Sequence, residues 1–247
     1  MTRTNGASKP YKAAIIQDFS TTKPWGQMTI DATANFIRRS ITHAQVDHYR
    51  AADGETLPPA KDYDLFVLTG GTVNLLEEEK PEWALRVLDL IRDAGALPDT
   101  KLIAFCWGHQ AVHYAFGGVL DVLVEGPRTV KIAVEEMHLT PEGTKLFGKD
   151  VLLLQKYHKR YISRLAPNFT ALAERCEIAC SREKGIITFQ GHPDLSREIV
   201  RTLIDTDDGL YKPSEALNRS PCGKLFSSDT ADDGDEVWYK IMDFVSA

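Results

Sequence analysis

Cys106 is the residue of this sequence best suited to act as a nucleophile. It lies in the stretch Ala-Phe-Cys-Trp-Gly-His-Gln at 104–110, where an apolar run gives way to a helical pattern. In an open α/β sheet, functional groups gather beyond the carboxyl ends of the strands, and a nucleophile there projects from a tight turn flanked by small residues. Gly108 supplies one small residue, and the N-terminus of the following helix favours negative charge on the sulfur. A cysteine at the end of a core strand is also often inert. The interpretation of Cys106 as a nucleophile therefore depends on whether the sequence also contains a base.

A base for this thiol occurs in the stretch Thr-Phe-Gln-Gly-His-Pro-Asp at 188–194. A cysteine nucleophile requires a proton acceptor, and that acceptor requires a group that orients it. His192 can accept the thiol proton, and Asp194 can hold the imidazole through its other nitrogen. Gly191 and Pro193 are typical of a turn that presents the ring. A lone histidine is more often structural, so the hypothesis depends on finding it together with the cysteine.

Two glycines follow the apolar run at 64–69, in the sequence Thr-Gly-Gly-Thr. An unbroken apolar run closed by glycines indicates a central parallel strand that enters a tight turn. The backbone N–H groups of Gly71 and Trp107 are predicted to form an oxyanion hole for a tetrahedral intermediate. Without the cysteine, the two glycines would indicate only a turn.

Alternating apolar runs and helical patterns are expected to position these residues. Buried strands are predicted at 13–17, 46–49, 64–69 and 101–106, and helices at 28–41, from Pro81 to Gly95, and at 109–116. This alternation of strands and helices is typical of a mostly parallel sheet with helices on both faces.

The pattern changes after residue 118, where short strand-like runs are separated by turn-forming residues such as those at 141–143. These runs lie at 119–123, 129–134, 151–154, 171–173, 178–181 and 186–189. We expect mixed or antiparallel strands that extend the same sheet, followed by a helix at 195–204. A flexible excursion is expected at 205–236 and a closing helix at 237–245, with Val237, Trp238, Ile241 and Val245 facing inward. The whole chain, 1–247, is predicted to be a single domain.

Composition excludes several classes of function. The net charge of −6 gives no basic footprint, so we expect no nucleic-acid partner. No run reaches about 18 apolar residues, so no membrane span is expected. The N-terminal stretch lacks an apolar segment, so we expect no secretory signal and a cytoplasmic location. The four cysteines show no metal-binding or disulfide spacing, which favours reduced thiols, no metal site and no cofactor.

The three elements, in this order, resemble the class I glutamine amidotransferase family with a Cys-His-Glu triad. The family patterns are G-x-C-x-G-x-Q at the nucleophile and G-H-P-E at the base, and the match extends over most of 13–204. The resemblance implies a flavodoxin-like three-layer sandwich and attack on a γ-carboxamide or γ-glutamyl bond through a thioester at Cys106. It also implies that Gln110 holds the amino-acid end of the substrate, with Tyr157 and His158 at the same end.

The sequence departs from the family pattern at three places. Ala104 stands where glycine is usual, and Asp194 stands where the family has a glutamate, which is one methylene longer. Lys159 and Arg160 replace the usual acidic pattern after the histidine, so a structural role for Tyr157 is the alternative to substrate contact.

No synthetase-like segment follows residue 204, and no P-loop pattern occurs. We therefore expect a stand-alone hydrolase of the γ-glutamyl peptidase-like branch, acting on glutamine or a small γ-glutamyl substrate. Ammonia is either released or delivered to a separate acceptor or synthetase chain. Two alternatives stay open. One is a hydrolase or tailoring enzyme for a specialised metabolite with the same triad, and the other is a catalytically silent binding protein, suggested by Ala104 and Asp194.

Overall fold

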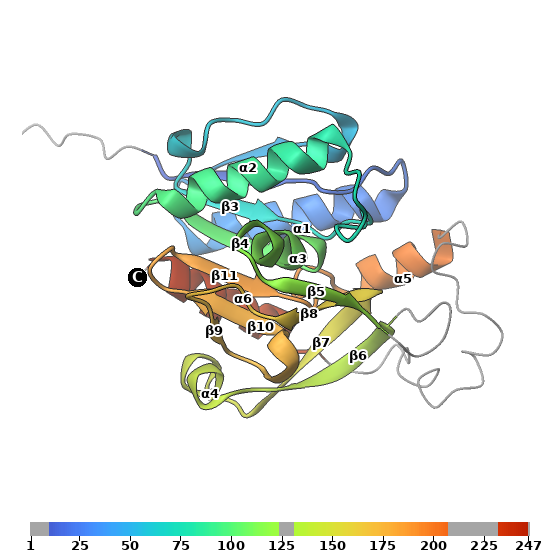
Figure 1. The fold of residues 1–247 in the computed structure, drawn as a ribbon, viewed down its shortest axis with the longest axis vertical. Helices are drawn as coiled ribbons and strands as arrows, with labels where there is room; N and C mark the ends of the chain where they lie inside the picture. Colours follow the sequence, from blue (N-terminus) through green and yellow to red (C-terminus); the bar gives the residue numbers. More distant parts are fainter. Residues whose placement is uncertain (1–9, 124–130, 207–231, 247) are drawn as a thin grey trace, which may run out of the picture.

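A computed structural model describes residues 10–123, 131–206 and 232–246, and its centre is a seven-stranded sheet (Figure 1). The strands are β1 (Lys12–Ile16), β2 (Gln45–Tyr49), β3 (Leu65–Leu68), β4 (Lys101–Phe105), β9 (Thr170–Ala171), β10 (Ile178–Ser181) and β11 (Ile186–Phe189). Their order is β2-β1-β3-β4-β11-β10-β9. The first five strands in this order are parallel. At the edge that follows them, β10 is antiparallel to β11, and β9 is antiparallel to β10. This order of parallel strands is that of the flavodoxin-like sheet, so the predicted fold class is confirmed.

Helices cover both faces of the sheet (Figure 1). The helices that pack on the sheet are α1 (Pro24–Ser40), α2 (Glu82–Ala96), α3 (Trp107–Ala115) and α6 (Gly234–Ser246), whereas α5 (Arg197–Thr206) packs on α1. Successive residues of a strand point to opposite faces. Ala13 and Ile15 of β1 accordingly pack in the same cluster as α1 and α6, whereas Ala14 and Ile16 pack with α2 and α3.

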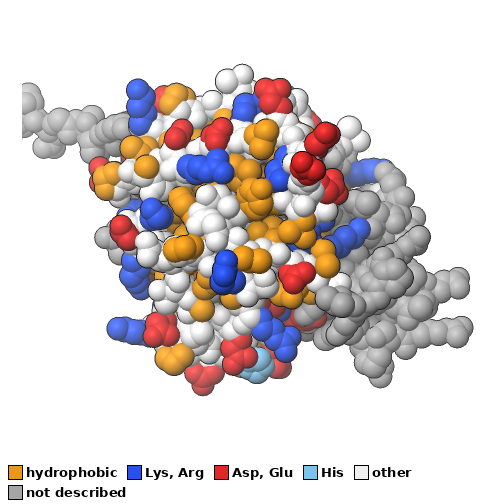
Figure 2. Space-filling view, viewed as in Figure 1, with side chains coloured by type: hydrophobic (Ala, Val, Ile, Leu, Met, Phe, Trp, Pro, Cys, Tyr) orange, Lys and Arg blue, Asp and Glu red, His pale blue; other side chains and the backbone are white. Residues whose placement is uncertain are grey.

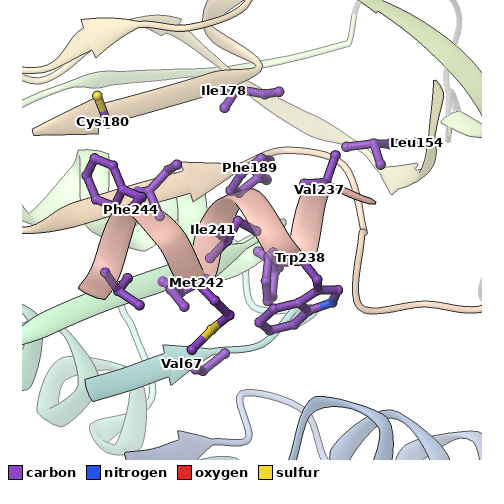
Figure 3. Packing of buried hydrophobic residues seen from close by; sticks show 14 of the residues in the cluster. Val67, Leu154, Ile178, Cys180, Phe189, Val237, Trp238, Ile241, Met242 and Phe244 are labelled. Atoms are coloured by element: carbon purple, nitrogen blue, oxygen red, sulfur yellow. The ribbon is translucent and has the colours of Figure 1, made fainter. Parts of the chain in front are cut away.

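The closing helix α6 anchors the C-terminal part of the described chain to the sheet. Its four residues predicted to face inward are buried. Figure 3 shows Phe189 beside α6, with Ile241 close to it and the Trp238 ring on another side of the helix. The Trp238 ring lies 5.3 Å from the ring of Phe105 and stacks at 5.2 Å on that of Phe36. Helix α6 therefore packs against both β4 and α1.

Several predicted boundaries were wrong by a few residues. Helix α1 begins at Pro24, four residues early, because a proline fits the first turn of a helix. Helix α2 runs through Gly95 and ends at Ala96, since Leu97 is extended before Pro98. The predicted excursion is helical at both ends, where α5 reaches Thr206 and α6 begins at Gly234, and its part at 207–231 lies outside the described residues.

The prediction that all strands after residue 118 extend the central sheet was wrong for two pairs. Strands β5 (Val119–Val122) and β8 (Arg160–Arg164) form one antiparallel pair, and β6 (Lys131–His138) and β7 (Val151–His158) form another. Strand β8 was not predicted. The segment expected to be a turn at 141–143 opens α4 (Pro141–Phe147), because the Thr140 side chain accepts a hydrogen bond from the Gly143 N–H and caps the helix.

Surface charge is mixed on the face shown in Figure 2, where Lys and Arg side chains lie among those of Asp and Glu. Within the described ranges, no helix is long and apolar enough to cross a membrane. The three described cysteines, Cys106, Cys176 and Cys180, are free thiols.

Candidate active site

Cys106 lies between β4 and α3 in a backbone conformation that is rare for a residue with a side chain. Its φ is 48° and its ψ is −101°. Such a conformation costs on the order of 1–3 kcal/mol and persists only where the surroundings enforce it. Here the Cys106 N–H donates to the carbonyl oxygen of Phe189 at 2.7 Å, and the Cys106 carbonyl accepts from the N–H of Gln110 at 3.1 Å. Both sides of the residue are therefore held.

The small residues around Cys106 explain how the turn packs. A Cβ atom at Gly108 would lie 2.8 Å from the Cβ of Leu68 and 3.1 Å from the Leu68 carbonyl oxygen, so a larger residue does not fit. Ala104 lies within β4, buried and paired with Leu68 on one side and Thr188 on the other. An alanine is therefore accommodated at this position as an ordinary strand residue.

His192 and Asp194, the predicted base and its predicted orienting group, follow the end of β11, the parallel neighbour of β4. His192 Nδ1 is 3.0 Å from Asp194 Oδ1, and both side chains are buried. The shorter aspartate therefore reaches the imidazole. Burial by itself lowers the pKa of His192, but the charges of Asp194 and Cys106, and the hydrogen bonds to both, raise it to about 10.

The glycine turn after β3 lies close to both Cys106 and His192. A Cβ atom at Gly70 would lie 2.9 Å from His192 Cε1 and 3.6 Å from Cys106 Cβ. A Cβ atom at Gly71 would lie 3.1 Å from Cγ of Trp107. The turn therefore touches both partners, and the two residues predicted to form the oxyanion hole are neighbours.

Strand β7 was predicted to stop at residue 154, but it continues to His158 and contacts both reacting groups. The carbonyl oxygen of Gln155 accepts a hydrogen bond from the His192 N–H at 2.8 Å. The carbonyl oxygen of Tyr157 lies 3.5 Å from the Cys106 Sγ, which donates to it. The β6–β7 pair thus holds the base and contacts the nucleophile from outside the central sheet.

The residues implied to bind the substrate divide into two groups. Tyr157 lines the cavity beside Cys106. Gln110 and His158 are buried, and Gln110 Nε2 and His158 Nδ1 each lie 2.9 Å from the carbonyl oxygen of Arg160. Neither is among the described residues that line the cavity.

Arg160, which in the sequence is only a departure from the family pattern, connects Gln110 and His158 to the segment after the glycine turn. Its Nη2 donates to the carbonyl oxygen of Thr72 at 3.1 Å and to that of Val73 at 3.3 Å. The indole N–H of Trp107 also donates to the Val73 oxygen, at 3.0 Å. The segment after Gly71 is therefore fixed by a guanidinium and an indole.

A buried histidine pair, which sequence reasoning missed, joins the two elements that carry the nucleophile and the base. On α3, His113 Nδ1 accepts from the N–H of Ala166, so its Nε2 carries the proton and donates to Thr188 Oγ1 at 3.3 Å. His109 Nδ1 lies 2.9 Å from the same hydroxyl of β11. Burial lowers the pKa of His113 to about 3 and that of His109 well below its usual range. Both rings are neutral.

Asp18 is a second residue that sequence reasoning missed. It follows β1 at the carboxyl edge of the sheet, and its N–H donates to Thr69 Oγ1 at 2.9 Å. Its carbonyl oxygen contacts the Gly71 position so closely that a Cβ atom there would collide with it. Burial raises the pKa of the Asp18 carboxyl well above its usual range. A charged residue directly after a buried strand was the signal that could have revealed it.

A cavity of about 380 Å³ opens beside these residues. Cys106, His192 and Asp194 line one side of it, together with the glycine turn and Tyr157. The segment from Phe19 to Thr29 and helix α5 form the remainder. This volume is in the range of small-molecule sites.

Comparison with known proteins decides the family. The chain is 30% identical over 241 residues to the glutamine amidotransferase-like protein chry6 of Gibberella zeae, and the alignment covers 97% of each chain. This chain belongs to the glutamine amidotransferase-like family. Within the family, the protein chyE of Penicillium rubens is 31% identical over 207 residues, covering 82% of each chain. Gamma-glutamyl peptidase 4 of Arabidopsis thaliana is 29% identical over 65% of this chain and 66% of its own length.

Solved structures of glutamine amidotransferases share the fold of this family member. That of Thermotoga maritima superposes with a TM-score of 0.74 at 17% identity, covering 97% of this chain and 100% of its own. That of Methylobacillus flagellatus gives a TM-score of 0.68 at 21% identity, covering 96% and 93%. No protein-family model matches the chain.

Proposed function

We propose that this protein hydrolyses a γ-glutamyl amide bond through a thioester at Cys106. The observation that carries the proposal is the enforced backbone conformation of Cys106 beside the buried His192–Asp194 pair. Strain of this kind clusters at active sites, which argues against a catalytically silent binding protein. Relatives named as glutamine amidotransferase-like proteins and γ-glutamyl peptidases support the γ-glutamyl substrate.

In the first half of the reaction, the Cys106 thiol gives its proton to His192 Nε2, because Nδ1 is engaged by Asp194. The thiolate attacks the γ-carbonyl carbon, and the N–H groups of Gly71 and Trp107 stabilise the oxyanion. The C–N bond then breaks as the protonated His192 gives its proton to the leaving nitrogen. Ammonia or an amine departs, and the γ-glutamyl group remains as a thioester.

In the second half, His192 accepts a proton from water, and the resulting hydroxide attacks the thioester carbon. The C–S bond breaks, the Cys106 sulfur regains its proton from His192, and glutamate is released. Asp194 keeps the imidazole oriented through both halves of the reaction. The glycine turn must also keep its position, because the Gly71 N–H stabilises the oxyanion. Thr72 and Val73, held by Arg160, provide that support.

We infer that Tyr157 contacts the amino-acid end of the substrate, because it lines the cavity. Gln110 and His158 would position that end only indirectly, because their side chains are hydrogen-bonded to the carbonyl oxygen of Arg160. Delivery of ammonia to a separate acceptor or synthetase chain, a single domain and a cytoplasmic location stay predictions.

Mass spectrometry after incubation with glutamine and γ-glutamyl peptides tests the proposal. We expect an acyl adduct on Cys106 and release of glutamate, both absent from Cys106→Ala. The matched control is Cys176→Ala, a half-buried thiol outside the cavity, which should retain both.

Glutamate release by folded Cys106→Ala would refute the thioester. Absence of adduct and of release with every γ-glutamyl compound would refute the γ-glutamyl substrate and favour a specialised metabolite instead.

A further inference from the structure

The cavity extends past the base, where four apolar side chains form most of the apolar part of its lining, called here the apolar wall. The same segments also contribute polar side chains, namely Ser20, Thr21, Lys23, Thr29 and Thr206. Phe19 and Trp25 come from the loop and first turn that join β1 to α1, and their ring centroids lie 4.8 Å apart. Leu195 follows the base, and Leu203 lies on α5; both are buried. The four side chains come from two segments far apart in the chain, which also pack against each other through Ile199 and Val200 of α5 and Met28 of α1.

His192 determines which end of the substrate this wall faces. In acyl transfer, the histidine that takes the proton of the nucleophile later gives a proton to the leaving amine, so the amine nitrogen lies beside the ring. Leu195 follows His192 by three residues, and α5 continues from there along the cavity. At the amino-acid end, Tyr157 lines the cavity beside Cys106, whereas Gln110 and His158 are not among the described residues that line it. The apolar wall therefore lies on the leaving-group side.

This side is less polar than ammonia requires. The whole cavity, which also holds the γ-glutamyl group beside Cys106 and Tyr157, has a volume of about 380 Å³, and a molecule the size of water or ammonia takes about 30 Å³. With ammonia as the leaving group, water would remain against Phe19, Trp25 and Leu203, which is unfavourable for apolar surface. An apolar substituent on the leaving nitrogen would displace that water.

Resting on the proposed function, we propose that the preferred leaving group is a primary amine that carries a large apolar side chain. A γ-glutamyl dipeptide with an aromatic or branched apolar second residue has this chemistry. In the first half-reaction its amide C–N bond breaks, the nitrogen takes the proton from His192, and the free apolar amino acid leaves. The γ-glutamyl group stays on Cys106, so the second half-reaction is the same for every leaving group.

The ratio of kcat/KM for γ-glutamylphenylalanine to that for γ-glutamylglycine tests the proposal in the unmodified protein. We expect a preference of at least about tenfold for the aromatic dipeptide, with glutamine lower still, because each buried methylene alone can contribute about that factor. A second measurement uses the thioester formed from either substrate. Added phenylalanine should intercept it in place of water more efficiently than added glycine.

Two variants locate the preference. Leu203→Ala should lower the kcat/KM ratio by about tenfold, because it removes part of the apolar wall. The matched control is Leu85→Ala, the same substitution at an exposed position of α2, which should leave the ratio unchanged. Thermal denaturation establishes that both variants are folded.

The outcomes separate this inference from the proposed function. Cleavage of all three substrates with a ratio near one would overturn the inference and leave the proposed function standing. A full preference in folded Leu203→Ala would also overturn it. No cleavage of any γ-glutamyl compound would overturn the proposed function and this inference with it.

Discussion

Replacing Asp194 by asparagine tests whether its charge orients His192 and stabilises the protonated ring that forms when His192 accepts the thiol proton. The substitution preserves the shape of a buried side chain that lies 3.0 Å from the imidazole. Burial lowers the pKa of His192, while Asp194 and then Cys106 raise it, from 6.5 to about 10. That rise corresponds to about 5 kcal/mol in favour of the protonated ring. Asp194 is the first of the charged groups that raise this pKa, so its loss should lower the pKa of His192. Because a positioned acid–base group contributes about 100-fold or more to rate, acylation should slow by roughly 100-fold.

The same substitution changes how stability depends on pH. A histidine whose folded pKa is raised stabilises the protein fully below its unfolded pKa and loses that contribution as pH rises through its folded pKa. In the unmodified protein, the free energy of unfolding should therefore fall between pH 6.5 and about 10. In Asp194→Asn the fall should be smaller, because the folded pKa of His192 loses its first-named charged cause. Urea denaturation across this range, with hydrolysis of a γ-glutamyl peptide, measures both effects.

The control is Asp243→Asn, at an exposed position of α6. It should match the unmodified protein in rate and in pH dependence. If Asp194→Asn hydrolyses the peptide within about threefold of the unmodified rate, and its stability profile superimposes on the unmodified one, the carboxylate does not hold the base.

Three further substitutions probe the supports of the site. Gly70→Ala puts a methyl group 2.9 Å from His192 Cε1, so it should lower kcat about 100-fold; unchanged kcat would contradict the placement of the turn between base and nucleophile. Thr188→Val removes a buried hydroxyl shared by two neutral imidazoles, and urea denaturation should show a loss of about 2 kcal/mol; a neutral effect would mean that the pair is not bonded there. Arg160→Met removes the guanidinium from the segment after Gly71, so kcat should fall about tenfold with little change in unfolding temperature; a change confined to KM would instead assign Arg160 to substrate binding.

Local pattern was enough to predict the elements that carry the chemistry. Apolar runs that end in small residues placed Cys106 and the glycine turn at the ends of β4 and β3, and a Gly-His-Pro turn placed His192 after β11. These predictions succeed because strand ends and tight turns are marked by residue types within a few positions of one another. The register of β3, β4 and β11 then brings the three turns to the same edge of the sheet.

Contacts between distant segments were decided by the tertiary structure. Nothing near Tyr157 indicates that β7 leaves the central sheet and sets its carbonyl oxygen against the Cys106 sulfur. Likewise, Arg160 donates a hydrogen bond to Thr72, in the segment after the glycine turn. Leu203 and Trp25 line the same cavity, although they are far apart in the chain. The sequence by itself therefore determined the fold class and placed Cys106 and His192, the proposed reacting groups, at strand ends, whereas folding decided the contacts that support them and the apolar side chains that line the cavity. The physical reason is that a short window encodes backbone conformation, but side-chain and carbonyl contacts over 50 or more residues depend on how whole elements pack.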